Sequence, residues 1–148
     1  MKRYTTGFCV VLIASLVAFF FSTGTAVVPD VIGVETASDG TATGYSGRTF
    51  NGKLVAIQYI KEDFANGVDF TITSEESGQT LWTQSDVNAS ATKYPLTQAC
   101  STAGVAATLD GTRALLVPIA LTNERIKVEI AQGGDTKVGA FGFIVEGY

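Results

Sequence analysis

Apolar and polar residues alternate with a period of two along most of the chain after residue 30, as in β-strands that bury one face. The sequence RIKVEI at residues 125–130 is the clearest case, with three aliphatic residues on one face and three charged residues on the other. Residues 68–73 repeat the pattern, and the apolar residues 54–60 predict another strand. Each stretch is bounded by polar or glycine-rich residues, which predict turns.

The C-terminal part predicts a further strand over residues 138–145, with two phenylalanines and a valine on one face. Gly139 and Gly142 interrupt it, which indicates a bulge or close packing of another backbone. The sequence QGGD at residues 132–135 is a hairpin signal between this strand and the preceding one.

Three more strands are expected, over residues 41–50, 80–84 and 113–120, with either Leu81 or Trp82 facing inward in the second. With shorter alternating stretches added to these seven, we expect roughly eight or nine strands at spacings of about 8 to 12 residues, without a convincing amphipathic helix. This pattern predicts an all-β fold, an antiparallel β-sandwich or jelly-roll-like domain, over residues 27–148.

Residues 1–26 form a separate apolar N-terminal segment. Lys2 and Arg3 precede an apolar run over residues 8–21 that contains one polar residue, Ser15, and small residues follow at 24–26, the order found in secretory signal peptides. A permanent membrane span is a weaker reading, since crossing a bilayer takes about 20 apolar residues. An arm retained and buried against a neighbouring subunit, or a misassigned start, are the other interpretations.

Charge argues against a nucleic-acid partner. The chain has 10 basic and 14 acidic residues, and removal of Lys2 and Arg3 with the leader would change the net charge from −4 to about −6. No basic cluster occurs in the rest of the chain, whereas nucleic-acid binding needs a basic face. The chain also lacks histidine and any phosphate-binding glycine loop, so Ser-His-Asp catalysis is excluded.

The two cysteines are Cys9, in the apolar run, and Cys100. Residues 27–148 therefore cannot form an intrachain disulfide, which is unusual for a small secreted domain. We expect Cys100 to be a buried, small apolar residue.

The candidates for glycosidase chemistry, which needs paired carboxylates, are Glu62 with Asp63, Glu75 with Glu76, and Asp110. All are predicted to lie in turns, where solvated carboxylates that end strands are the ordinary case. Residues 62–69 carry several oxygen-bearing side chains, but without the spacing of a calcium-binding loop. We therefore predict no enzyme, no catalytic or metal-binding residue and no cofactor.

Two further features of the sequence indicate a function only weakly. Asn88-Ala89-Ser90 matches a glycosylation acceptor, a tripeptide that is common by chance. Trp82 and the tyrosines could form a platform on which a sugar stacks, but an isolated Trp on a strand is more often part of the core.

The stretch GKLVAIQYIKEDFANGVDFTITSEESGQTLW, residues 52–82, resembles a family of small β proteins encoded among the virion structural genes of tailed bacteriophages and prophages. The resemblance continues through residues 94–145, where a "YP" after a polar turn, an "ALYDGT"-like stretch and an "ERIKVxIAQGG" strand and turn recur in this order. It covers about 100 residues. The family members begin near the equivalent of residues 27–34, without the apolar leader.

This resemblance implies a virion protein assembled in the host cytoplasm, most simply a decoration or cement protein on the head, and otherwise a minor tail or head-fibre component. The implied partners are the major capsid protein or other virion subunits, with self-association expected. The lone Cys100 suits a cytoplasmic origin. The alternative is an exported bacterial β-sandwich, secreted or periplasmic, that binds carbohydrate or acts in adhesion. Membrane contact is expected only if residues 1–26 stay as an anchor.

Overall fold

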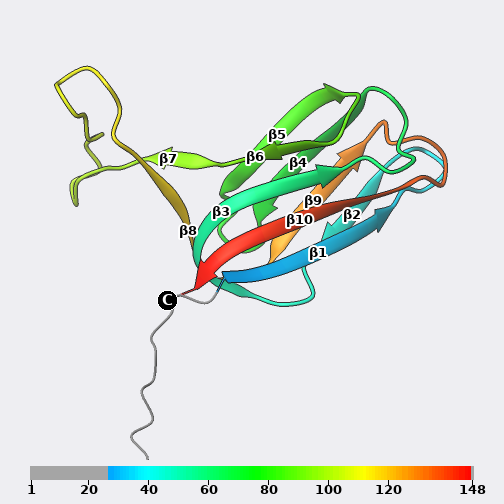
Figure 1. Ribbon diagram of the computed structural model, residues 1–148, viewed down its shortest axis with the longest axis horizontal. Coiled ribbons are helices and arrows are strands. Elements are labelled where there is room, and N and C mark those ends of the chain that lie inside the picture. Colours follow the sequence, from blue (N-terminus) through cyan, green and yellow to red (C-terminus); the bar gives the residue numbers. More distant parts are fainter. Residues whose placement is uncertain (1–26, 148) are drawn as a thin grey trace, which may run out of the picture.

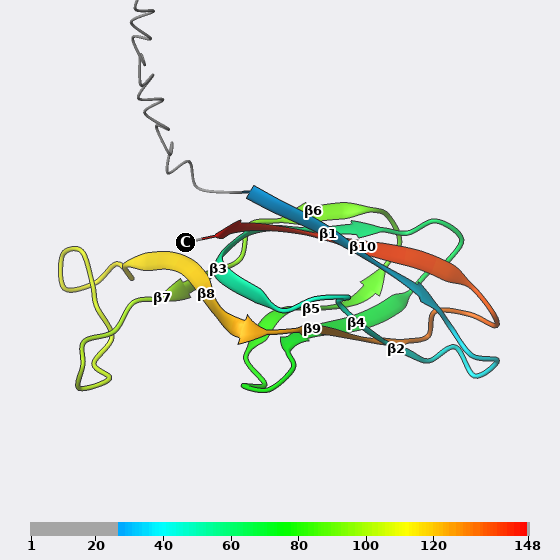
Figure 2. The same cartoon turned by 90° about the horizontal axis from the view of Figure 1, so that it is seen from below.

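The computed structural model describes residues 27–147, which form two antiparallel β-sheets packed face to face (Figures 1 and 2). The larger sheet has the order β1 (Val27–Glu35), β10 (Val138–Gly147), β3 (Phe50–Ile60), β8 (Leu116–Glu124) and β7 (Leu96–Gln98), with β6 (Ala91–Lys93) also paired to β3. The smaller sheet has the order β2 (Ala42–Tyr45), β9 (Ile126–Ala131), β4 (Val68–Ser74) and β5 (Thr80–Val87). The predicted all-β antiparallel fold is confirmed.

The core lies between the sheets and is built by the residues that alternation placed inward. On β4, Val68, Phe70 and Ile72 are buried, and on β9 every second residue from Ile126 is buried. The ring of Phe70 meets Trp82 edge-on at 4.8 Å between centroids. Tilted and edge-on aromatic pairs of this kind add about 0.5–1.5 kcal/mol beyond area burial. The expectation that Trp82 belongs to the core is confirmed.

Both Leu81 and Trp82 are buried, although strict alternation allowed only one of them to face inward. The pairing of β4 with β5 shifts register between Ile72 and Thr73, next to the partners of these two residues. Such a bulge lets two successive side chains reach the same face.

The turn at residues 132–135 does not close a hairpin, so that prediction is wrong. The strand before it, β9, pairs with β2 and β4, whereas β10 after it pairs with β1 and β3 in the other sheet. The turn therefore carries the chain from one sheet to the other. Buried Thr36 supports this crossing, since its hydroxyl donates to the Gly134 carbonyl at 2.7 Å.

Two predicted strands have different bounds in the structure. Residues 41–50 divide into β2 in the smaller sheet and the start of β3 in the larger one, because the chain changes sheet around Ser46. The strand expected over residues 113–120 is β8, Leu116–Glu124, so residues 113–115 precede it. Pro118 lies opposite Leu96 of the edge strand β7, where its missing N–H is tolerated.

No helix occurs in residues 27–147, and hence none there could span a membrane. The hypotheses about residues 1–26 concern a segment outside the described residues.

Candidate binding surface

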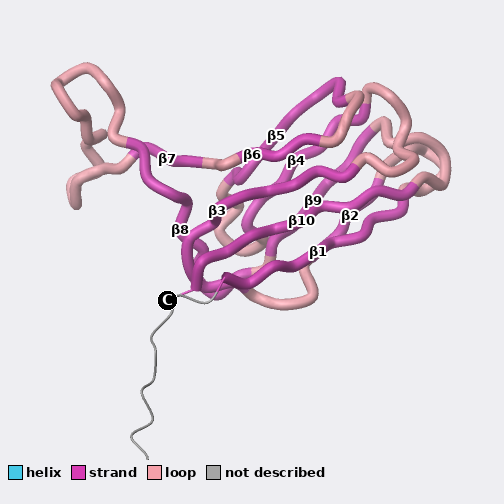
Figure 3. Tube along the Cα trace, in the orientation of Figure 1, coloured by secondary structure: helices cyan, strands magenta, loops and turns pink. Residues whose placement is uncertain are grey.

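An arm, defined here as residues 94–118, projects from one end of the sandwich (Figures 1 and 3). Its base is the pair of strands β7 and β8, and β7 pairs with no other strand of residues 27–147. Beyond this base, β8 bends back to the sandwich and pairs with β3 (Figure 2). Within the described part of the chain, the arm is therefore attached to the sandwich only through its two ends.

Beyond its base, the arm has a junction at which backbone hydrogen bonds join three segments of the chain. The Ala99 N–H donates to the Leu115 carbonyl at 2.9 Å, and the Leu115 N–H donates to the Ala107 carbonyl at 3.0 Å. The Ala107 N–H completes the cycle by donating to the Ala99 carbonyl at 2.8 Å. The three segments are thus hydrogen-bonded to one another outside the two sheets, and these bonds give the outer part of the arm a defined shape.

Two small hairpins leave this junction, and turn residues close each of them. In the first hairpin, the Gly104 N–H donates to the Ser101 carbonyl at 2.9 Å, and Gly104 adopts a left-handed φ of 76°. In the second, the Asp110 carboxylate accepts from the backbone N–H groups of Thr112 and Arg113. Asp110 also pairs with the Arg113 guanidinium at 2.8 Å.

The arm exposes apolar side chains to solvent. Half of the large hydrophobic residues that are exposed among the described residues lie on it, and they are Tyr94, Leu96, Val105, Leu109, Leu115 and Leu116. Tyr94 is 71% exposed and Val105 is 66% exposed. Asp110 and Arg113 are the arm's only charged residues, and they neutralise each other. An apolar element of zero net charge, held away from its own core, is a candidate surface for binding another molecule.

Cys100 lies on the first hairpin and is exposed, so its predicted burial is wrong. The prediction assumed that residues 99–115 belong to the sandwich, whereas this segment leaves it. The thiol therefore lies on the candidate binding surface.

The carboxylates considered for catalysis do not converge on a cleft but stabilise turns and strand ends. Glu75 accepts two hydrogen bonds of 2.6 Å from the Arg125 guanidinium, which lower the pKa of Glu75. Asp63 accepts from the Val138 N–H at 2.6 Å, and this bond lowers the pKa of Asp63. Backbone and side-chain hydrogen bonds from Arg113 likewise lower the pKa of Asp110.

Glu62 and Glu76 are the remaining members of those pairs, and both are exposed in turns. Glu62 has a φ of 45°, a left-handed conformation that serves the turn after β3. Glu62 and Glu76 are thus part of turns that connect strands.

The oxygen-rich residues 62–69 also fail to form a cation site. The two carboxylate oxygens of Asp69 accept from the Asp86 N–H and the Gln132 amide, each at 2.8 Å. No cluster of three or more metal-ligating side chains occurs in residues 27–147. Asn88, the glycosylation candidate, uses its side-chain oxygen to accept from the Gly67 N–H at 2.9 Å.

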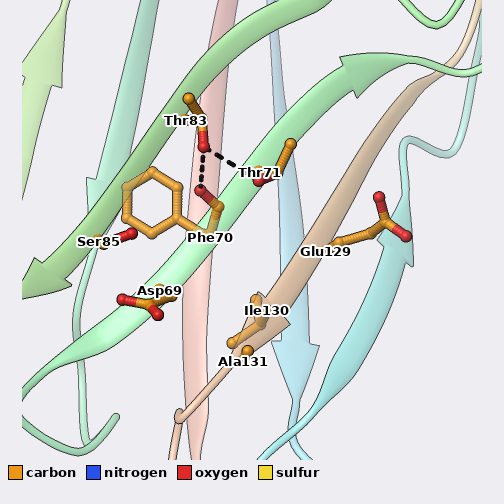
Figure 4. Close-up of a pocket in the computed structure, with 8 residues that line it drawn as sticks. All are labelled: Asp69, Phe70, Thr71, Thr83, Ser85, Glu129, Ile130 and Ala131. Carbon is orange, nitrogen blue, oxygen red and sulfur yellow. Dashed lines mark hydrogen bonds between the residues drawn. The ribbon is translucent and has the colours of Figure 1, made fainter.

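A shallow depression of about 160 Å³ lies on the outer face of the smaller sheet (Figure 4). Side chains of Asp69, Thr71, Thr83, Ser85 and Glu129 line it, and the hydroxyls of Thr71 and Thr83 are 3.1 Å apart. Because its lining comes from neighbouring strands and the two threonines bond to each other across them, the depression is explained by sheet packing.

A second apolar area lies on the outer face of the larger sheet, where Val27, Val31, Ile60 and Val138 are exposed. Charged residues interrupt it, since Glu35 is paired with Val138 and Glu146 with Val27. The arm is the more continuous uncharged surface.

Comparison of the chain with models of protein families, with curated protein sequences and with solved structures gives no match in any of the three.

Proposed function

We propose that this chain is a non-enzymatic structural subunit of a bacteriophage virion, and that it binds neighbouring subunits through the arm. The observation that carries the proposal is the projection of an uncharged apolar element from an otherwise closed sandwich. The resemblance of residues 52–82 and 94–145 to phage structural proteins supports it and supplies the biological setting. The finer form of the proposal is a decoration or cement protein on the head.

Docking of the arm would gain free energy from the burial of its exposed apolar side chains. Burying one large aliphatic or aromatic side chain contributes about 1.5–3 kcal/mol, so docking of the arm would offset much of the cost of association. Small individual contacts repeated over many copies stabilise a shell by avidity. A subunit of this kind needs a stable body and an adhesive projection, and it needs no reactive centre.

Mass spectrometry of purified virions tests the proposal. We expect this chain in particles at a copy number comparable to that of the major capsid protein. Absence of the chain would overturn the virion assignment, and only a few copies per particle would overturn the decoration form. Particles that carry Leu109→Asp on the arm should lose the chain, whereas Val31→Asp, an equally exposed valine on the sandwich, should leave it bound.

The alternative is an exported β-sandwich that binds carbohydrate or acts in adhesion, and the signal-like order of residues 1–26 favours it. Trp82 is buried, so a sugar platform would have to use other aromatic residues. N-terminal sequencing of the protein from its native cell separates the two functions. A mature start at Val27 would favour export, and a retained Met1 or Lys2 would favour the virion subunit.

A further inference from the structure

A groove lies where the arm joins the sandwich. Its lining comes from the edge strand β5 and from the chain entering the arm, namely Leu81, Trp82, Thr83, Gln84, Lys93, Tyr94, Pro95 and Leu96. The groove has a volume of about 430 Å³, and Lys93 is its only charged residue. The surface at the base of the arm is thus as poor in charge as the arm itself.

The edge strand β7 also has a free hydrogen-bonding side. Antiparallel strands alternate between residues whose backbone groups point to the partner and residues whose groups point away. The Ala99 N–H donates to Leu115 across the arm, which sets this alternation. The N–H and C=O groups of Leu96 and Gln98 therefore point away from β8, and no strand of residues 27–147 pairs with them. Such an edge is a template for another strand.

We infer that two copies of this chain associate through their arms about a two-fold axis. The β7 strands pair antiparallel with the axis near Thr97, so that Leu96 of one copy hydrogen-bonds with Gln98 of the other. This register brings Cys100 and the first hairpin of each arm to Tyr94 in the groove of the other copy. The inference rests on the proposed role of the arm as the binding element and names its partner.

A second copy fits this surface because the arm and the groove form a self-complementary set. The groove lies at the base of the arm, and the first hairpin lies beyond β7 at its outer end. When two arms pair antiparallel, the hairpin of each copy therefore reaches the groove of the other, and both grooves are filled as a two-fold interface requires. The two charges of the arm pair with each other, and the groove carries Lys93 as its one charge, so the association brings at most one unpaired charge per copy into the interface. Residues 81–84 and 93–118 together match the roughly 20–30 residues that each partner brings to a standard interface.

The backbone pairing has a sharp test in a single position. Gln98→Pro removes the N–H that faces the free edge, while Gln98→Ala, the matched control, keeps it and removes the side chain that bonds to Ala107. Analytical ultracentrifugation of the full chain should give a concentration-dependent monomer–dimer equilibrium. We expect Gln98→Pro and Val105→Asp to weaken dimerisation at least tenfold, and Gln98→Ala and Val31→Asp to change it less than threefold.

Cys100 supplies a second readout that folding defects alone would not reproduce. Alkylation of this thiol, followed on its own peptide by mass spectrometry, should slow at least tenfold as concentration rises through the dimerisation range, and Gln98→Pro should abolish the slowing. In the proposed register the two Cys100 residues lie about six residues apart, roughly 20 Å, so reductant should leave the dimer intact. A dimer that disappears with reductant would overturn the inference.

A strictly monomeric wild-type chain, or a dimer unaffected by Gln98→Pro and Val105→Asp, would also overturn the inference. These results are separate from those for the proposed function. A chain that is monomeric in solution and abundant in virions would retain the virion function and lose the arm-paired dimer. A dimer with the expected variant responses that is absent from virions would do the reverse.

Discussion

The ring of Phe64 occupies the space into which a side chain on Gly139 would extend. A β-carbon on Gly139 would lie less than 3.0 Å from three carbons of that ring, and Phe64 is 1% exposed. The turn after β3 therefore packs onto the start of β10 through this glycine. The close approach that the sequence indicated at Gly139 involves an aromatic side chain, and the bulge of β10 lies at residues 144–145.

Gly139→Ala should lower the free energy of unfolding by about 1–3 kcal/mol, because the fully buried Phe64 ring must move to admit a methyl group. Gly33→Ala is the control, since a β-carbon there meets nothing within 4 Å. We expect the control to stay within about 0.5 kcal/mol of the wild type. Urea unfolding followed by the fluorescence of the single tryptophan measures both variants; equal effects would show that the contact is not tight.

The second prediction concerns Tyr59, whose side chain is buried in the aromatic core. Its hydroxyl has no hydrogen-bond partner among the described residues, and burial raises the pKa of Tyr59 to about 12. An unpaired buried hydroxyl is costly, so Tyr59→Phe should leave the free energy of unfolding unchanged or raise it by about 1 kcal/mol. Loss of more than about 1 kcal/mol would mean that the hydroxyl is satisfied.

The raised pKa of Tyr59 also predicts a loss of folding stability at alkaline pH. The pKa of Tyr59 is higher in the folded state than its ordinary value of 10.0, so the folded state holds the proton more tightly. Its contribution to stability is present below about pH 10 and is lost as the pH rises toward 12. Tyr59→Phe should flatten this part of the pH profile, and Tyr94→Phe, at an exposed position, should leave it as in the wild type.

The sequence predicted the strands whose one face is buried by the other sheet, such as β4 and β9, because each alternates apolar and polar residues without interruption. It did not predict the route between sheets after Gln132, since turn composition indicates a reversal and not the strand that is joined. Nor did it predict the arm. The apolar residues 114–117 look like part of a core strand, because the sequence pattern alone does not tell whether the surface that covers a strand belongs to the same chain.

The arm does have one signal in the sequence, namely its scarcity of charged residues. Residues 94–118 contain only Asp110 and Arg113 as charged residues, while the surrounding strands carry charges on their outer faces. A long charge-poor stretch with several small residues, Gly104 and Gly111 among them, fits poorly in a sandwich that must keep one face in water. The turn positions of Glu62, Asp63, Glu75 and Glu76 were predicted correctly, because the neighbouring polar residues and glycines indicate turns.

The third prediction concerns acid stability. Hydrogen bonds from Arg125 hold the pKa of Glu75 below its ordinary value of 4.5, so the pair stabilises the fold above about pH 4.5 and loses this effect as the pH falls further. Glu75→Gln should therefore reduce the loss of stability between about pH 5 and pH 3. Glu76→Gln is the control, since Glu76 forms no ion pair within residues 27–147. Urea titrations at a series of pH values measure the slopes; identical slopes for the wild type and Glu75→Gln would contradict the prediction.

The last prediction separates the arm from the stability of the sandwich. Replacing residues 100–114 by Asn-Gly would join Ala99 to Leu115, which are already hydrogen-bonded, through a turn suited to a hairpin. Because the removed residues contact only the arm's own junction in the hydrogen-bond network, the free energy of unfolding should change by less than about 1 kcal/mol. The dimerisation described above should weaken at least tenfold, because the first hairpin that reaches the partner's groove is removed while β7 is kept.

Replacement of residues 62–66 by Gly-Ser-Gly is the matched control, because it also shortens a loop but removes buried Phe64, whose ring stacks on Tyr59 at 6.4 Å between centroids. Loss of a buried phenylalanine costs about 3–5 kcal/mol, so this variant should unfold at much lower urea. Circular dichroism and urea unfolding measure both changes. If shortening the arm were as destabilising as shortening the loop, the arm would be part of the folding core, and its exposed apolar residues would no longer point to a binding role.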